Sequence, residues 1–252
     1  MCRLLALATR APTTMVDVLG EDLESFVDLS RQHADGWGMA WYDGAGGLSV
    51  AKDVGPAHTS DLLEKLSRTV DSDLALLHLR RATPGLAVAL ENTHPFIGGS
   101  VAFAHNGAIH PFEDLDALLA TDARSRLRGT TDSERYFLAL LAGLEQAGSV
   151  EQALPDLFEQ IAGGYRYTAL NFVLLTSERL YAACVFNPDE EAARLREDPA
   201  YYHLPYRVSP DTVVVGSSGW SGLSGGAWRT LSNGQALVVE RRTLATRVLE
   251  LI

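Results

Sequence analysis

Cys2 is the residue whose type and position in this sequence most suggest chemistry. It directly follows Met1, which aminopeptidases remove when the next side chain is small, as that of cysteine is. The processed chain would then begin with a thiol and a free α-amine on one residue. The pKa of an α-amine is about 7.7–8.0, so a useful fraction is an unprotonated base near neutral pH. Cys2 would thus be a nucleophile with its own general base, although a small buried cysteine opening a strand is the simpler interpretation.

Further polar segments lie where predicted elements end, which is where binding and catalytic sites are usually built. They are His78-Leu79-Arg80-Arg81-Ala82-Thr83, Asn92-Thr93-His94, His105-Asn106-Gly107 and Thr131-Asp132-Ser133-Glu134. Each has a plain structural alternative. Arg80 can be a surface charge, His94 a loop histidine, Asn106-Gly107 a turn, and Asp132 a favourable charge at a helix N-terminus. Taken singly, none of these segments predicts a function.

The hydrophobic pattern predicts the elements that must position these residues. Apolar runs predict strands over residues 3–9, 37–42, 48–52, 74–80, 101–105, 168–175, 179–186, 213–217, 236–240 and 246–251. Helical spacing predicts helices over residues 14–32, 60–67, 113–120, 131–144 and 149–162, the fourth of them opened by a capping box. Residues 187–211 are predicted to be a surface loop with a little helix, and residues 217–226 either an active-site loop or a long connection. Strands, helices and strands again indicate stacked sheets with helices outside, in a single domain over residues 2–252.

Composition and charge narrow the class of protein. The 252 residues are 46% hydrophobic and 21% charged, which is typical of a soluble globular protein with a sizeable core. The net charge of −11 argues against a nucleic-acid partner, and no segment approaches the ~20 apolar residues that span a bilayer. The two cysteines form neither a disulfide framework nor a zinc motif. We therefore expect a cytoplasmic protein without metal, cofactor or membrane partner.

Taken together and in this order, the polar segments resemble a known family. Cys2, His78-Leu79-Arg80 with Thr83, His105-Asn106-Gly107 and Thr131-Asp132-Ser133-Glu134 are similar to motifs of the class II glutamine amidotransferases, which are N-terminal-nucleophile hydrolases. The turn at Asp35-Gly36-Trp37-Gly38 also resembles one in that family. The resemblance runs from residue 2 to about residue 141. It implies an α+β fold, the four-layer αββα sandwich, and looks most like the short stand-alone bacterial branch.

The resemblance implies catalytic roles for three residues. Cys2 would attack the side-chain amide of glutamine, or of a γ-glutamyl amide, and form a γ-glutamyl thioester, with its α-amine as the general base. The side chain of Asn106 and the backbone N–H of Gly107 would hold the oxyanion. A glycine there lets the backbone approach the substrate closely.

The resemblance also implies a set of substrate-binding residues. Arg80 would bind the α-carboxylate of the substrate, for which a guanidinium fork is well matched, and Asp132 would pair with its α-ammonium. Thr83 would line the loop over the site. We also count His94 as a substrate-binding residue, so the expected partner is a small molecule with a free amino-acid head group.

Alternatives stay open at the level of the sequence. The leading interpretation is an enzyme that hydrolyses its amide substrate unaided, because no synthase domain is recognisable after residue 141. The chain would otherwise be a glutaminase subunit that supplies ammonia to a separate synthase partner, or a non-catalytic γ-glutamyl-binding subunit. A homo-oligomer is compatible with each of these.

Overall fold

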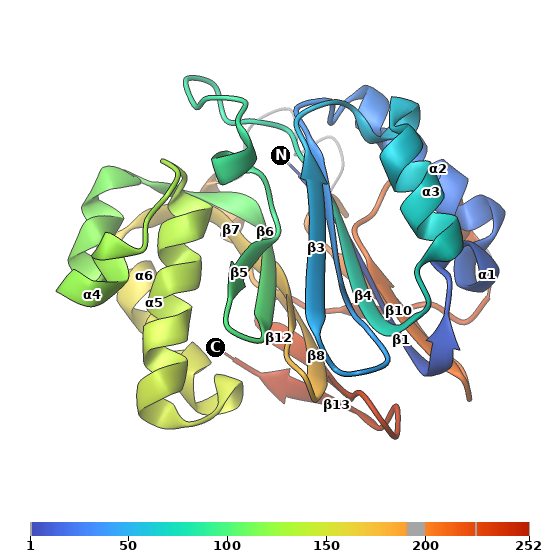
Figure 1. Cartoon of the computed structure of the whole chain (residues 1–252). Coiled ribbons are helices and arrows are strands. Elements are labelled where there is room, and N and C mark those ends of the chain that lie inside the picture. Colours follow the sequence, from blue (N-terminus) through green and yellow to red (C-terminus); the bar gives the residue numbers. More distant parts are fainter. Residues whose placement is uncertain (1, 191–199, 225, 252) are drawn as a thin grey trace.

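Two antiparallel sheets stack face to face in the computed structural model, which describes residues 2–190, 200–224 and 226–251 (Figure 1). The seven-stranded sheet has the order β11 (Arg229–Leu231), β9 (Leu204–Val208), β10 (Thr212–Gly216), β1 (Arg3–Thr13), β4 (Ser72–Leu79), β2 (Trp37–Tyr42) and β3 (Leu48–Asp53). The six-stranded sheet has the order β13 (Thr246–Glu250), β12 (Gln235–Glu240), β8 (Arg179–Cys184), β7 (Arg166–Leu175), β6 (Val101–His110) and β5 (Phe96–Gly98).

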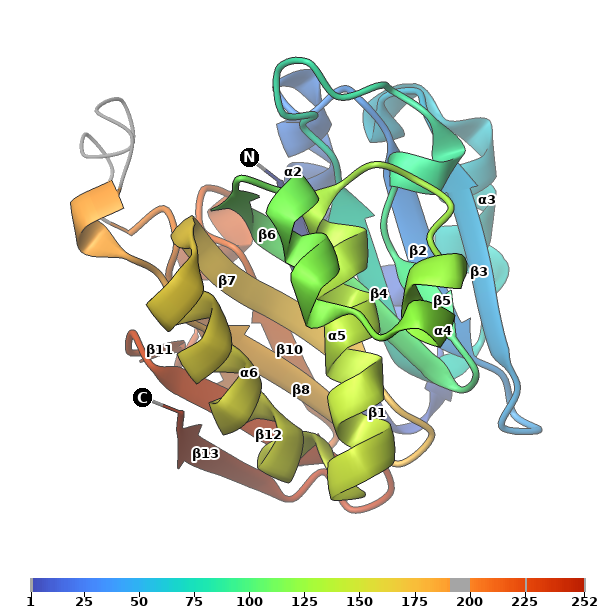
Figure 2. The same cartoon turned by 90° about the vertical axis from the view of Figure 1, so that its left-hand side faces the viewer.

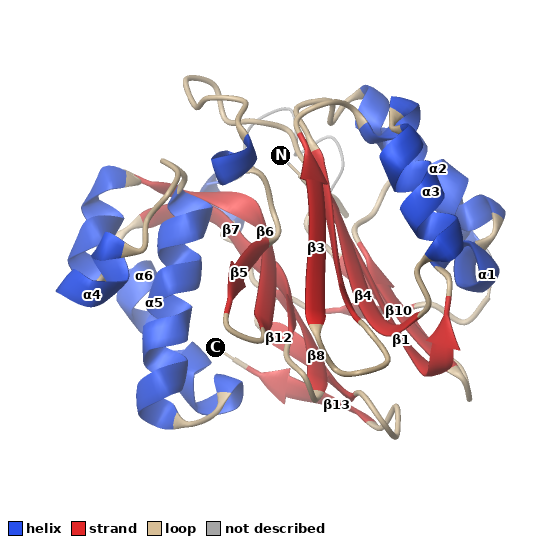
Figure 3. Cartoon of the chain, in the orientation of Figure 1, coloured by secondary structure: helices blue, strands red, loops and turns tan. Residues whose placement is uncertain are grey.

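Helices cover the outer face of each sheet, which completes four layers (Figure 3). The helices α1 (Met15–Leu19), α2 (Glu21–Asp28) and α3 (Asp61–Thr69) lie outside the seven-stranded sheet. The helices α5 (Asp132–Ala147) and α6 (Val150–Gly164) lie across β6, β7 and β8, with the short α4 (Thr121–Ser125) beside them (Figure 2). The predicted αββα sandwich is therefore confirmed. No helix in the described ranges is both long and apolar enough to cross a membrane.

Alternation along β1 decides which way the start of the chain points. Leu4 and Ala6 pack between the two sheets, whereas Leu5 and Leu7 pack against the outer helices. This is the two-residue period of a strand with both faces buried. Cys2 lies two residues before Leu4, so the same period directs its side chain into the space between the sheets.

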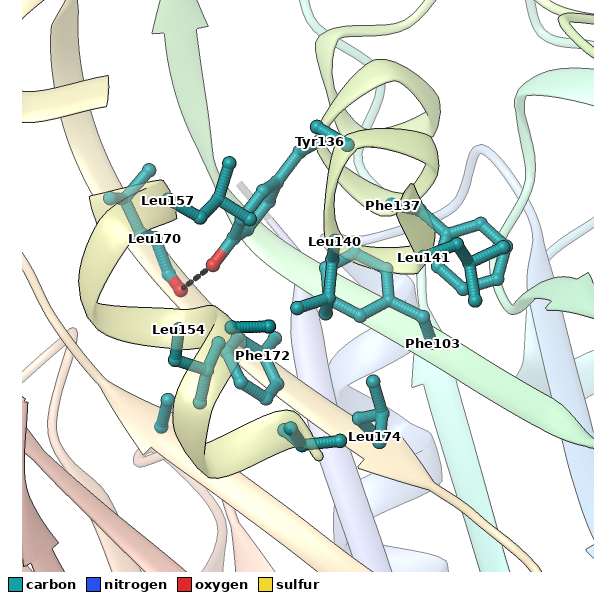
Figure 4. Packing of buried hydrophobic residues seen from close by; sticks show 14 of the residues in the cluster. Phe103, Tyr136, Phe137, Leu140, Leu141, Leu154, Leu157, Leu170, Phe172 and Leu174 are labelled. Carbon is teal, nitrogen blue, oxygen red and sulfur yellow. Dashed lines mark hydrogen bonds between the residues drawn. The ribbon is translucent and has the colours of Figure 1, made fainter. Parts of the chain in front are cut away.

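The first turn of α5 is fixed by packing and by capping. Phe103 of β6 makes an edge-to-face contact with Tyr136, with ring centroids 5.2 Å apart, and the Tyr136 hydroxyl donates to the carbonyl of Leu170 at 3.4 Å (Figure 4). Thr131 caps the helix by accepting from the N–H of Glu134 at 3.2 Å. The Glu134 carboxylate does not close the predicted capping box. It accepts from the backbone of residues 128 and 129 instead, so it anchors the loop that leads to Asp132.

The structure corrects several sequence-based predictions. The helix predicted over residues 14–32 is divided at Gly20, whose positive φ of 53° interrupts α1 and α2. The loop predicted over residues 187–211 contains β9, which hydrogen-bonding to β10 and β11 holds in the sheet, while residues 191–199 lie outside the described part. The short strands β5 and β11 were not predicted. The strand predicted to stop at residue 105 continues to His110, because β7 pairs with it beyond Asn106-Gly107, and its register shifts between Gly107 and Ile109.

Replacing Gly38 with alanine should lower the free energy of unfolding by about 1–3 kcal/mol, the usual cost of overpacking. Gly38 lies opposite His78 in the β2–β4 ladder, and a Cβ there would press on the carbonyl of His94 and lie 2.8 Å from Cδ of Pro95. Urea denaturation would measure the loss. Gly44→Ala is the matched control, since a Cβ at Gly44 has no neighbour within 4 Å. Equal midpoints for the two variants would contradict this account of the packing.

Candidate active site

The polar segments identified in the sequence meet at one cavity of about 390 Å³. Its lining comes from Cys2, the loop after β4, the segment before β5, the middle of β6, the start of α5, and Thr168 of β7. Of the predicted site residues, those that line it are Cys2, Arg80, Thr83, His94, Gly107 and Asp132. Segments more than a hundred residues apart in the chain thus line the same cavity.

The Cys2 thiol is held beside a backbone carbonyl. Its Sγ lies 3.7 Å from the carbonyl oxygen of Arg81, to which the thiol donates. Burial raises the pKa of the Cys2 thiol above its ordinary value, and the positive charge of Arg80 opposes that shift to a smaller extent. The thiol is therefore protonated at neutral pH. Nucleophilic attack by this sulfur requires a base that removes the proton.

Arg80 is a buried cation that forms no ion pair with a carboxylate of the described residues, although the charge of Asp35 acts to raise its pKa. Its side chain is 3% exposed, and its guanidinium donates to two carbonyl oxygens, those of Ala87 at 3.0 Å and Asp35 at 3.4 Å. The backbone of Arg80 is bonded on both sides to the Asp35-Gly36 turn. Burial lowers the pKa of the guanidinium, which nonetheless stays charged at any pH the protein meets. None of the ion pairs among the described residues involves Arg80.

Asp132 is the complementary case, a buried carboxyl group without a cationic partner among the described residues. It is 6% exposed and stands at the first position of α5, where the helix dipole favours negative charge. Its Oδ2 accepts from the N–H of Ile109 at 2.8 Å, and its Oδ1 lies 3.4 Å from the Ser133 hydroxyl. Because buried charges are normally paired, an unpaired cation and an unpaired anion on one cavity suit a zwitterionic ligand.

Asn106 and Gly107 lie side by side in β6 but differ in their relation to the cavity. Gly107 lines it, and a Cβ there would overlap the carbonyl of Ala169 and approach Nε2 of His105 at 2.7 Å, so only glycine fits. Asn106 is not among the lining residues. Its side chain is 1% exposed, and neither of its amide atoms has a hydrogen-bond partner among the described residues. A buried amide with both ends unsatisfied is uncommon in a structural position.

Two buried histidines, His94 and His78, lie next to each other at the cavity. The ring of His94 is 4.3 Å from that of His78 and 4.6 Å from that of Phe96. Burial lowers the pKa of both histidines well below the ordinary value, so both imidazoles are neutral near pH 7. His94 reaches the cavity, whereas His78 supports it from β4. His78 belongs to a segment that the sequence analysis singled out, but it was given no role there. The two-residue period of β4, in which Leu74 and Leu76 pack between the sheets, was the signal that could have placed its side chain.

Other lining residues were not assigned a role from the sequence. Asn92 connects three loops, because its Oδ1 accepts from the N–H of Thr130 at 2.8 Å and its Nδ2 donates to the carbonyl of Ala87 at 3.1 Å. His105, Ser133 and Thr168 also line the cavity, and the first two stand inside motifs that the sequence analysis quoted. Thr83 closes its loop by accepting from the N–H of Leu86 at 3.0 Å.

Two further expectations concern the Gly/Ser-rich stretch 217–226 and metal binding. None of the described residues in the Gly/Ser-rich stretch 217–226 lines the cavity. Trp220 in that stretch is buried against Phe26 and Trp228, which makes the stretch an anchored connection. Within residues 2–190, 200–224 and 226–251, no three His, Cys, Asp or Glu side chains are grouped so as to hold a metal ion.

Comparison with known proteins identifies relatives over nearly the whole chain. The family described as class II glutamine amidotransferases matches residues 1–215. Putative glutamine amidotransferases of Haemophilus influenzae and Escherichia coli are each 27% identical over 94% of this chain, and the matches cover 86% and 100% of those proteins.

Solved structures agree with this assignment. A glutamine aminotransferase class-II domain protein from Silicibacter pomeroyi superposes with a TM-score of 0.66 and 26% identity over 98% of both chains. The allosteric regulatory enzyme of purine biosynthesis superposes with a TM-score of 0.72 at 19% identity. The match covers all of this chain and 49% of that enzyme, so it bears on the fold alone. With the ordered motifs, the fold and the family match in agreement, this chain belongs to the class II glutamine amidotransferases.

Proposed function

We propose that this protein hydrolyses the side-chain amide of glutamine, or of a γ-glutamyl amide, through a thioester on Cys2. Its family is defined by use of the glutamine amide. The observation that carries the proposal is the pair of buried, unpaired charges, Arg80 and Asp132, on the same cavity as the Cys2 thiol. A glutamine head group supplies one opposite charge to each of them.

Substrate binding follows from these charges. The Arg80 fork binds the α-carboxylate and Asp132 binds the α-ammonium, so the substrate pairs two charges that the empty cavity leaves buried and unpaired. The remaining side chain of the substrate then extends toward Cys2. Thr83 and the neutral ring of His94 border the same cavity and contact the bound substrate.

The proposed chemistry uses the α-amine that removal of Met1 sets free. This amine takes the thiol proton, and Sγ of Cys2 bonds to the amide carbon. The Gly107 N–H and the Asn106 side-chain amide hold the oxyanion of the tetrahedral intermediate. The protonated α-amine of Cys2 returns its proton to the leaving nitrogen of the substrate, the C–N bond breaks, and ammonia or an amine departs. Water then attacks the thioester with the same amine as base, which gives glutamate and the free thiol.

We further propose that residues 2–252 act as one domain. Residues of both sheets share the core between them, among them Leu4 and Val215 from one sheet and Ala104 and Val239 from the other. The proposed chemistry needs protons, a thiol and hydrogen-bond donors, all of which the chain's own residues supply, so no cofactor takes part.

A second candidate function is that of a glutaminase subunit which delivers ammonia to a separate synthase partner. The observation in its favour is that the same fold makes up 49% of the purine-biosynthesis enzyme, beside a comparable length of further chain. A partner protein would then take the place of that further chain.

The test is an assay of Met-processed protein, verified by mass spectrometry, for glutamate released from glutamine and from a bulky γ-glutamyl amide. Turnover by the purified chain supports the proposed hydrolase. Turnover that appears only with cell extract, and that co-purifies with a second polypeptide, favours the subunit. Tight binding of the substrates without turnover under either condition would make the chain a non-catalytic γ-glutamyl-binding subunit.

Arg80→Lys and Asp132→Asn should each lower kcat/KM for glutamine roughly 10- to 100-fold, the usual worth of a charge-assisted hydrogen bond. Lysine keeps the charge of Arg80 but loses its bidentate fork, and asparagine keeps the shape of Asp132 but loses its charge. Steady-state kinetics would measure both losses. Arg10→Lys and Asp211→Asn, in an exposed ion pair on the surface, are the matched controls. Unchanged kcat/KM in both site variants would remove these residues from substrate binding.

A further inference from the structure

His105 borders the cavity, yet the proposed chemistry gives it no task. Its ring is 1% exposed and makes two polar contacts. Nε2 lies 3.0 Å from the carbonyl oxygen of Ala169 in β7, and Nδ1 lies 2.9 Å from Oγ of Ser133 in α5. Oγ of Ser133 in turn lies 3.4 Å from Oδ1 of Asp132. The imidazole therefore bridges a strand of the sheet and the first turn of the helix that carries Asp132.

The chemistry of the partners fixes where the protons are. A carbonyl oxygen only accepts, so Nε2 of His105 carries a proton and donates it to Ala169. In the neutral ring Nδ1 is then an acceptor, and the Ser133 hydroxyl donates to it. A hydroxyl has a single proton, so Ser133 cannot also donate to Asp132. Oδ1 of Asp132, a residue that lines the cavity, is thus left with open acceptor capacity.

We infer that His105 and Ser133 are positioning residues that keep Oδ1 of Asp132 available for the α-ammonium of the substrate. The inference rests on the proposed function, in which Asp132 binds that ammonium. The carboxylate is held at its other oxygen by the N–H of Ile109, at 2.8 Å, so its orientation is set from β6 as well. The same bridge also requires Gly107, because a Cβ there would meet both the Ala169 carbonyl and Nε2 of His105.

Protonation of His105 would reverse this arrangement. With a proton on Nδ1, the ring donates to Oγ of Ser133, and the hydroxyl proton turns to Oδ1 of Asp132, where it competes with the substrate ammonium. The titratable groups that face the ring are Asp132 and Tyr136 on α5, His78 on β4, and His94. Burial lowers the pKa of His105, with the Asp132 charge opposing it. The ring is therefore neutral at pH 7, and glutamine should bind more weakly as the pH falls through the His105 pKa.

Equilibrium binding separates a positioning role from a merely structural one. Processed protein with Cys2→Ala, which cannot turn over, would be titrated by calorimetry with glutamine and with glutaric acid monoamide, which lacks the α-amino group. Adding His105→Phe, which removes the acceptor of the Ser133 hydroxyl and lets it turn to Oδ1 of Asp132, should weaken glutamine roughly three- to tenfold, the worth of one hydrogen bond, and leave the monoamide unchanged. Ser133→Ala alone leaves Oδ1 free and should bind glutamine as the parent does, and Ser133→Ala added to His105→Phe should restore glutamine binding. A loss in His105→Phe that is equal for both ligands, or no loss for either, would overturn the inference.

A second variant tests the protonation step independently. His105→Asn has no titrating ring, so the ratio of its dissociation constant for glutamine to that for the monoamide should stay constant on acidification, whereas the same ratio for the parent should rise as the pH falls through the lowered pKa of His105. Parallel pH profiles for the two proteins would count against the inference. Asp132→Asn separates failure of the inference from failure of the proposed function. If Asp132→Asn does not weaken glutamine more than the monoamide, the proposed substrate-binding role fails together with the inference. If Asp132→Asn does so and His105→Phe does not, only the inference fails.

Discussion

Protein that retains Met1 should turn over glutamine at least roughly a thousandfold more slowly than processed protein, because loss of a general base costs about that much. With Met1 in place, the nitrogen of Cys2 is part of a peptide bond and cannot accept the thiol proton. Burial raises the pKa of this thiol, so very little thiolate forms at neutral pH without the base. Two preparations that differ only at Met1, each verified by mass spectrometry, should therefore differ in kcat and not in thermal stability.

The pH dependence of kcat/KM provides a second test of the role of the α-amine. In processed protein, kcat/KM should rise with pH as the α-amine loses its proton, around pH 8. In protein that retains Met1, the residual rate should rise only at more alkaline pH, where the thiol ionises by itself. Cys2→Ala should abolish turnover in either form. Cys184→Ala is the matched control, because Cys184 is fully buried beside the Tyr202 carbonyl, and this variant should cost about 1 kcal/mol of stability without loss of turnover. Full activity in protein shown to retain Met1 would refute the mechanism.

Asn106→Ala should lower kcat by roughly 100- to 1,000-fold, or about 2.7–4 kcal/mol, the usual value of one oxyanion donor. KM should change little, because the donor serves a charge that develops only in the transition state. Steady-state kinetics on glutamine would separate the two parameters. A variant in which KM rises and kcat is kept would move Asn106 from the oxyanion to ground-state binding. Asn233→Ala, on an exposed turn, provides the control.

Gly107→Ala should have a still larger effect on activity and should also destabilise the fold. The added methyl group would overlap a backbone carbonyl of β7, which cannot give way without breaking the β6–β7 ladder. We expect turnover to fall by at least the loss seen for Asn106→Ala, accompanied by a lower midpoint of unfolding. An active and equally stable variant would show that the two strands separate more easily than their packing indicates.

Residue type and order carried more information about this site than local structure did. The segment His105-Asn106-Gly107 was identified as a candidate site from its place among the other motifs. Its secondary structure was predicted wrongly, since Asn-Gly is a strong turn signal taken alone and pairing with β7 overrides it. For the same reason β9 was missed, because its pairing with β10 and β11 is a property of the sheet and not of residues 204–208 alone.

The burial and the missing ion-pair partners of the two charged site residues could not be predicted from the sequence. Nothing near Arg80 or Asp132 in the chain indicates that both are buried and that neither forms an ion pair among the described residues. That follows only from where β4 ends and α5 begins relative to each other. The direction of the Cys2 side chain was not predicted from the sequence either, because both faces of β1 are buried and only the structure shows which alternate residues lie between the sheets.

The pairing of β1 on both edges has a consequence for how such a protein can diversify. The strand that carries Cys2 is bonded to β4 on one side and β10 on the other, and Leu4 also exchanges hydrogen bonds with Ser217. Cys2, the proposed nucleophile, therefore cannot be moved without disturbing the centre of a sheet. The cavity wall at residues 81–86 is instead a short loop outside any strand, with Pro84 and Gly85 exposed. Substitutions there that spare the Arg81 carbonyl and Thr83 can change the shape of the cavity while the sheet holds Cys2 in place, so the range of ligands that fit can change without rebuilding the core.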